Sequence, residues 1–84
     1  MNDVSRAVEL HREAVRLRGE GKLKEALERS NQALEILERA RGPAHPDVAN
    51  VLLCRGEVHQ EAARYDESER DFGRAVAILD QMSG

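Results

Sequence analysis

GPAHPDVA, residues 42–49, interrupts a chain that is otherwise dense in Ala, Leu, Glu and Arg, the residues that favour helices. Gly42 can adopt the left-handed conformation that ends helices, and Pro46 suits the first position of a helix, where its missing N–H is no loss. His45 precedes a proline, and this position disfavours helical geometry. Asp47 lies in the first turn of the expected helix, where its carboxylate interacts favourably with the positive end of the helix dipole. The stretch therefore predicts the end of one helix and the start of the next.

Apolar residues recur at helical spacing on both sides of this stretch. Gly19 and Gly21 predict the end of the first helix, because glycine readily takes the conformation that closes helices. Asp66 with Glu69 three residues later resembles a capping box at the start of the last helix. The sequence thus predicts four helices, over about residues 4–17, 23–40, 47–62 and 66–82.

The two halves of the chain repeat each other with a period of 42 residues. A shift of this length aligns identical residues at seven places, namely Ala7/Ala49, Leu10/Leu52, Glu25/Glu67, Ala33/Ala75, Ile36/Ile78, Leu37/Leu79 and Gly42/Gly84. The sequence therefore predicts an all-α single domain over residues 1–84, built from two helix-turn-helix repeats. The first repeat is expected at about 4–41, the second at about 46–82, and the linker between them at 42–45.

These residues resemble the tetratricopeptide repeat family, in the 42-residue form found in kinesin light chains. The residues 45-HPDVA-49 resemble the linker of that form. The rest of the resemblance comes from Leu10, Ala14, Leu17, Gly21 to Ala26 and Ala33 in the first repeat, and Leu52, Gly56, Tyr65 to Ser68, Phe72 and Ala75 in the second. It implies four antiparallel helices in a short right-handed superhelical stack, in which small residues let helices approach closely.

The chain departs from the family pattern at several core positions. Ser30 stands where a large apolar residue is common, and His59 stands where an aromatic residue is common. Ala62 and Ala63 stand where a glycine usually ends the helix. These differences lead us to expect unusual packing around the second repeat.

The resemblance implies a groove along the leading helix of each repeat, which holds a peptide or protein partner. The groove positions in this chain are Val8, His11, Val15 and Arg18 in the first repeat, and Asn50, Leu53, Glu57 and Gln60 in the second. An apolar strip on a charged chain indicates a contact surface. The alternative interpretation is that Val8, Val15 and Leu53 simply pack against neighbouring helices.

Chaperone-binding members of the family hold a terminal carboxylate with lysines and asparagines in the groove. The corresponding places here carry His11, Val15 and Cys54, so this function is not expected. Cys54 is the single cysteine, which cannot form a disulfide within the chain and agrees with a reducing compartment. We expect it to be a small buried side chain.

The composition argues against nucleic-acid and membrane partners. The formal net charge of −3, from 13 basic and 16 acidic residues, gives no attraction to phosphate backbones or anionic lipid. One Tyr, one Phe and no Trp provide little surface for base stacking. The longest apolar run, Val51 to Cys54, is far too short to span a membrane, and the N-terminus lacks the apolar core of a signal peptide. We expect an intracellular, cytoplasmic protein.

No catalytic, metal or cofactor site is predicted. The three histidines are far apart in sequence, and Cys54 and His59 are five residues apart, which does not place two ligands on one helix face. Residues 19-GEGK-22 lack the spacing and the following Ser or Thr of a phosphate-binding loop. The acidic run over 66–71 lacks the central glycine of a calcium loop. An enzyme would need a clustered polar site, which the sequence does not indicate.

Two repeats are fewer than such arrays usually need, because each repeat is stabilised by its neighbours. The last helix therefore carries apolar residues that one repeat cannot cover, namely Val76, Ile78, Leu79 and Met82. A second copy of the chain, a partner, or further sequence could cover them, and we favour self-association into a homo-oligomer through a closed symmetric contact. The competing hypothesis is a purely structural homodimerisation element with no open groove.

Overall fold

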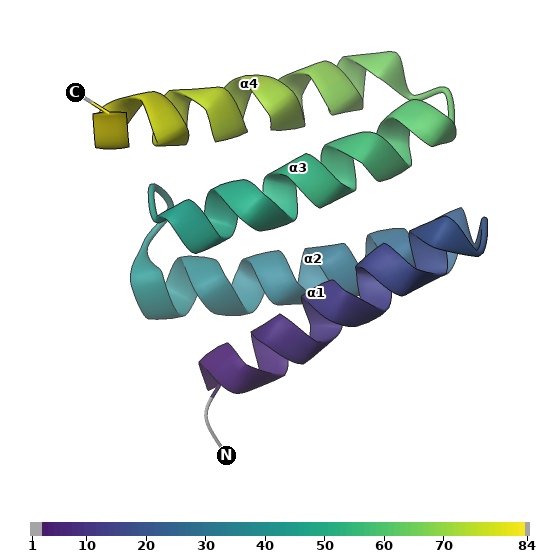
Figure 1. Ribbon diagram of the computed structural model, residues 1–84, viewed down its shortest axis with the longest axis horizontal. Coiled ribbons are helices and arrows are strands. Elements are labelled where there is room, and N and C mark those ends of the chain that lie inside the picture. The colour runs from purple at the N-terminus through teal and green to yellow at the C-terminus, as the bar shows by residue number, and fades with distance from the viewer. Residues whose placement is uncertain (1–2, 84) are drawn as a thin grey trace.

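The computed structural model describes residues 3–83, which form four α-helices and no strand. The helices are α1 (Asp3–Gly19), α2 (Leu23–Arg41), α3 (Pro46–Glu61) and α4 (Tyr65–Ser83). Helix α1 packs against α2 and α3 against α4, and the two hairpins join through contacts between α2 and α3 (Figure 1). The predicted all-α architecture is confirmed, and every predicted helix end agrees within two residues.

The linker from residue 42 to residue 45 combines a backbone stop with a side-chain cap. Gly42 has a φ of +88°, and its N–H donates to the Glu38 carbonyl at 2.9 Å. His45 is extended, with φ −80° and ψ 145°, and its Nδ1 accepts a hydrogen bond from the Asp47 N–H at 3.0 Å. Pro46 is the first residue of α3, as predicted. The cap from His45 was not predicted, because histidine is not among the usual capping residues.

The two tight turns inside the hairpins have the same geometry but different residues. Gly21 has a φ of +78°, and Ala63, which is 42 residues later, has a φ of +61°. Each turn is closed by a backbone hydrogen bond between residues five positions apart. These bonds run from Lys22 N–H to the Leu17 carbonyl at 2.9 Å and from Arg64 N–H to the His59 carbonyl at 2.8 Å. The second turn therefore places a Cβ-bearing residue in the conformation that glycine adopts without cost.

The predicted capping box at the start of α4 is wrong. The helix begins at Tyr65, one residue before Asp66, and the Ser68 N–H donates to the Arg64 carbonyl at 3.0 Å. Asp66 therefore lies inside the first turn and cannot be the N-cap residue. There its carboxylate, with that of Glu67, lies near the positive end of the helix dipole.

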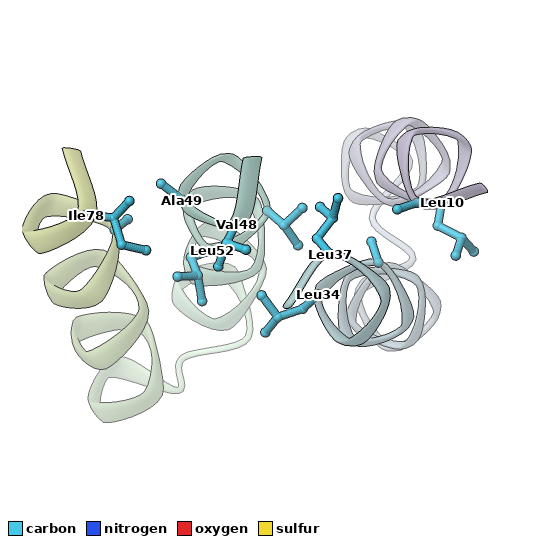
Figure 2. Packing of buried hydrophobic residues seen from close by; sticks show 11 residues of the cluster. Leu10, Leu34, Leu37, Val48, Ala49, Leu52 and Ile78 are labelled. Carbon is cyan, nitrogen blue, oxygen red and sulfur yellow. The ribbon is translucent and has the colours of Figure 1, made fainter. Parts of the chain in front are cut away.

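The core lies along α3 and contains residues of all four helices. Figure 2 shows its labelled members, Leu10 of α1, Leu34 and Leu37 of α2, Val48, Ala49 and Leu52 of α3, and Ile78 of α4. The small residues predicted at helix contacts are buried, namely Ala14, Ala26, Ala33, Gly56, Ser68 and Ala75. A Cβ built on Gly56 would lie 2.8 Å from Cε1 of Phe72, so the missing side chain of Gly56 makes room for this ring.

Candidate protein-interaction surfaces

Two surfaces are candidates for binding. The first, here called the α1–α3 surface, consists of the eight groove residues named from the sequence, Val8, His11, Val15, Arg18, Asn50, Leu53, Glu57 and Gln60. Helices α1 and α3 contact each other much less than either contacts its hairpin partner. None of the eight residues is buried, and Val8, Val15, Asn50 and Gln60 are exposed.

One end of the α1–α3 surface is a small pocket. Val8, His11 and Asn50 line it together with Leu37, and it has a volume of about 120 Å³. Burial lowers the pKa of His11 from its ordinary value, which favours the neutral imidazole. The structure thus brings together three of the residues named from the sequence, in a mainly apolar pocket that also holds the Asp47 carboxylate.

The other end of the α1–α3 surface is held by ion pairs between the two helices. Arg18 of α1 lies 3.5 Å from Glu57 and 3.0 Å from Glu61 of α3. Glu61 was not named from the sequence, because its role depends on the place where α1 crosses α3. Gln60 is exposed nearby. The surface is therefore apolar at one end and charged at the other.

The apolar residues of the α1–α3 surface differ in how far they are covered. Val8 and Val15 are 42% and 43% exposed, whereas Leu53 is partly buried and packs against the core. Leu53 thus packs against the core, as the alternative interpretation has it, and the role of the two valines stays a prediction. Cys54 is buried, as expected, and burial raises the pKa of its thiol, so the thiolate is disfavoured.

The second surface, here called the α4 face, consists of Val76, Leu79 and Met82, which are all exposed. Figure 1 shows α4 at one edge of the molecule, where it packs against α3. Ile78 does not belong to this face. It is only 4% exposed and points from α4 toward α3, as Figure 2 shows, so its assignment to a self-association surface is wrong.

The equivalent residues of α2 indicate what the α4 face lacks. Leu34, which corresponds to Val76, is 6% exposed, whereas Val76 is 53% exposed. Leu37 is 3% exposed and its counterpart Leu79 is 38% exposed. Helix α3 packs against α2 and covers Leu34 and Leu37. Within residues 3–83, no helix packs in the same way against the outer side of α4, where Val76 and Leu79 lie.

A buried charged cluster lies inside the second hairpin. Arg55 donates two hydrogen bonds of 2.7 Å to the carboxylate of Asp71, and Nε2 of His59 lies 3.8 Å from the same carboxylate. Burial lowers the pKa of His59, although the nearby Asp71 carboxylate raises it. Because both oxygens of Asp71 are engaged by Arg55, we interpret the cluster as a packing feature. Within residues 3–83, no three His, Cys, Asp or Glu side chains are grouped to hold a metal.

Comparison with known protein families places most of the chain in one of them. The family model described as "Tetratricopeptide repeat" matches residues 10–81. Comparisons with curated proteins and with solved structures found no match. Among the described helices, none has the length and apolar character needed to cross a membrane.

Proposed function

The chain belongs to the tetratricopeptide repeat family, and we propose that it is a non-enzymatic interaction module that binds a peptide or protein on the α1–α3 surface. Repeats of this family generally mediate protein–protein interactions. The observation that carries the proposal is the pocket to which α1 contributes Val8 and His11 and α3 contributes Asn50. The exposed Val15 extends the apolar strip along α1. A peptide lying across both helices would bury these side chains.

The α4 face supports a further part of the proposal, which is self-association. A head-to-tail contact would place α4 of one copy against α1 of the next, as α2 packs against α3 within the chain. This contact is disfavoured, because the outer side of α1 is charged where the equivalent side of α3 is apolar. Val48, Val51 and Val58 of α3 are buried, whereas their counterparts on α1 are Arg6, Glu9 and Arg16, which form exposed ion pairs. We therefore propose a two-fold symmetric contact between α4 faces.

Two finer points remain predictions. The relation to the kinesin light chain form depends on the linker residues 45–49. The intracellular, cytoplasmic location depends on the composition and on the free, buried Cys54.

The groove proposal is tested with peptides selected from a random displayed library on the immobilised chain. Their affinity is then measured by fluorescence anisotropy on the native chain, on Val15→Glu and on Val76→Glu. Both substitutions place the same charge at an exposed valine, so the second is the matched control. We expect Val15→Glu to weaken binding by about tenfold or more and Val76→Glu to leave it unchanged. Equal effects of the two substitutions would contradict the α1–α3 surface as the binding site.

Self-association is tested by light scattering over a dilution series of the native chain and of Leu79→Glu. We expect a native oligomer that Leu79→Glu shifts to monomer, with no change of mass for Val15→Glu. A native monomer, or an unchanged mass for Leu79→Glu, would contradict the α4 contact. A loss of mass for Val15→Glu would instead favour the structural homodimer, in which a second copy fills the α1–α3 surface.

A further inference from the structure

A second pocket lies between α2 and α3, and none of the eight residues of the α1–α3 surface lines it. It has a volume of about 440 Å³, and we call it the α2–α3 pocket. Its apolar lining includes Leu23 and Leu27 of α2 and Val58 of α3. Leu23 and Leu27 are only partly buried, so their side chains are partly open to an incoming group. The pocket is large enough for a single bulky apolar side chain.

The same pocket contains a histidine at a position where the first repeat uses leucine. His59 is 8% exposed and its Nδ1 is buried without a hydrogen-bond partner. Its counterpart Leu17 is buried in the apolar cluster with Val58. An unpaired buried nitrogen costs stability, and leucine serves the packing role at this position in the first repeat. His59 thus adds a polar nitrogen to the pocket wall, at a position where the first repeat has leucine.

The edge of the α2–α3 pocket is basic. Lys24 of α2 and Arg64 of the α3–α4 turn both line it, and neither forms an ion pair with another residue of the range 3–83. Glu28 is the one acidic residue of the lining, so two basic residues and one acidic residue give a net charge of +1. The whole chain has a net charge of −3. The lining thus carries a net positive charge on a chain that is acidic as a whole, which favours a negatively charged ligand.

We propose that the α2–α3 pocket is a second docking site, which takes one large apolar side chain from an acidic segment of a partner peptide. The apolar side chain lies against Leu23, Leu27 and Val58, and flanking carboxylates pair with Lys24 and Arg64. A small inorganic anion would satisfy the cations but leave the apolar walls uncovered. This site is independent of the proposed binding on the α1–α3 surface.

The experiment uses the full isotope-labelled chain and the probe peptide Ac-Asp-Asp-Leu-Asp-Asp-amide in an NMR titration. We expect amide shifts at Leu23 to Asn31 and at Val58 to Arg64. Two matched peptides, one with alanine in place of leucine and one with lysines in place of the aspartates, should each bind about tenfold more weakly or worse. Shifts confined to the α1–α3 surface, or no shifts, would overturn the proposal.

Variants of exposed residues separate the two parts of the site. Lys24→Glu combined with Arg64→Glu should weaken binding of the probe about tenfold, and the weakening should shrink in high salt. Arg12→Glu combined with Arg70→Glu, an equal charge change at two exposed residues outside the pocket, is the control and should have no effect. Ala62→Trp, at an exposed residue of the pocket edge, should block binding without a change in the core. Unchanged affinity in the double variant would contradict the role of the two cations.

Two controls identify the occupant. Val15→Glu should leave probe binding unchanged, so that failure of the α1–α3 surface and failure of this pocket are distinguishable. Tyr65, followed by Asp66 and Glu67, presents similar chemistry from a second copy of the chain. If dilution of the chain without peptide shifts the pocket amides, the occupant is a second copy and the peptide proposal is wrong.

Discussion

The two hairpins make the same inter-helix ion pair with the charges exchanged. In the first hairpin, Glu13 of α1 pairs with Arg29 of α2 at 2.9 Å. In the second, Arg55 of α3 pairs with Asp71 of α4 at 2.7 Å, and each residue lies 42 positions after its counterpart. Both hairpins therefore place opposite charges at these two positions, although the sign at each position differs. Burial differs, however, because the side chain of Glu13 is 37% exposed and that of Asp71 is 8% exposed.

Side-chain volume is also distributed differently in the two hairpins. Gly56 of α3 leaves room for the ring of Phe72, whereas the equivalent residues of the first hairpin are Ala14 and Ser30, both fully buried. A smaller residue on the leading helix thus accompanies a larger one on the second helix. The comparison teaches that each hairpin conserves the fit between its two helices while its individual residues change.

The largest expected effect comes from breaking the buried pair of the second hairpin. Arg55→Met should lower the free energy of unfolding by about 3 kcal/mol, because it leaves the Asp71 carboxylate buried without its partner. Arg29→Met, the matched change in the first hairpin, should cost less than about 1 kcal/mol, because that pair is partly solvated. Urea unfolding of both variants provides the test. Equal losses would mean that burial does not distinguish the two pairs.

The next effect is expected at His59, whose counterpart is Leu17. His59→Leu should raise the free energy of unfolding at pH 7 by about 1.5 kcal/mol, because it removes an unpaired buried nitrogen. Urea unfolding at pH 7 measures this gain. A loss of stability would show that the contact of His59 with Asp71 outweighs the cost of its burial.

The same substitution should change the pH dependence of stability. Burial lowers the pKa of His59 below the ordinary value of 6.5. As the pH falls, His59 therefore becomes protonated in the unfolded chain at a higher pH than in the folded chain. The free energy of unfolding therefore decreases from pH 7 toward the pKa of the folded state. His59→Leu should reduce this decrease, and the remainder should include His11, whose pKa burial also lowers. An unchanged slope between pH 7 and pH 5.5 would contradict this assignment.

The turns provide a pair of opposite changes. Ala63→Gly should stabilise the chain by about 1 kcal/mol, because glycine adopts a positive φ without the strain that a Cβ causes. Gly21→Ala should destabilise it by about the same amount in the equivalent turn. Thermal and urea unfolding of the two variants would measure both signs. The comparison fails if both substitutions change stability in the same direction.

The smallest effect is expected at the helix starts. Helix α3 has a side-chain cap from His45, whereas Lys22 at the start of α2 makes no such hydrogen bond. His45→Ala should lower the free energy of unfolding by about 0.5 kcal/mol, and Lys22→Ala should have a smaller effect. Urea unfolding measures both. If the two variants are equally stable, the hydrogen bond from the Asp47 N–H to His45 contributes nothing.

Periodicity and turn residues were sufficient to predict the fold. The spacing of apolar residues, with Gly42 and Pro46, placed four helices within two residues of their observed ends. The family resemblance named positions of which three line one pocket across α1 and α3. These features could be predicted because they depend on local geometry and on a regular repeat.

Features that depend on how helices meet could not be predicted in the same way. Ile78 and Leu79 are neighbours on one helix, and only the position of α3 decides that the first is buried and the second exposed. The ion pair of Arg55 with Asp71 was not predicted. The charges at these two positions are exchanged between the repeats, so a search for identical residues does not find them. Ala63 has a positive φ because the surrounding turn imposes it, and its residue type gives no sign of this.

The most direct test of the central claim, that α1 and α3 form one binding surface, is an NMR titration of the native chain with a peptide selected as described above. The account predicts that amides of Val8, His11 and Val15 on α1 shift together with those of Asn50 and Leu53 on α3, all with one dissociation constant. Shifts on one of these helices only, or only on α4, would contradict it.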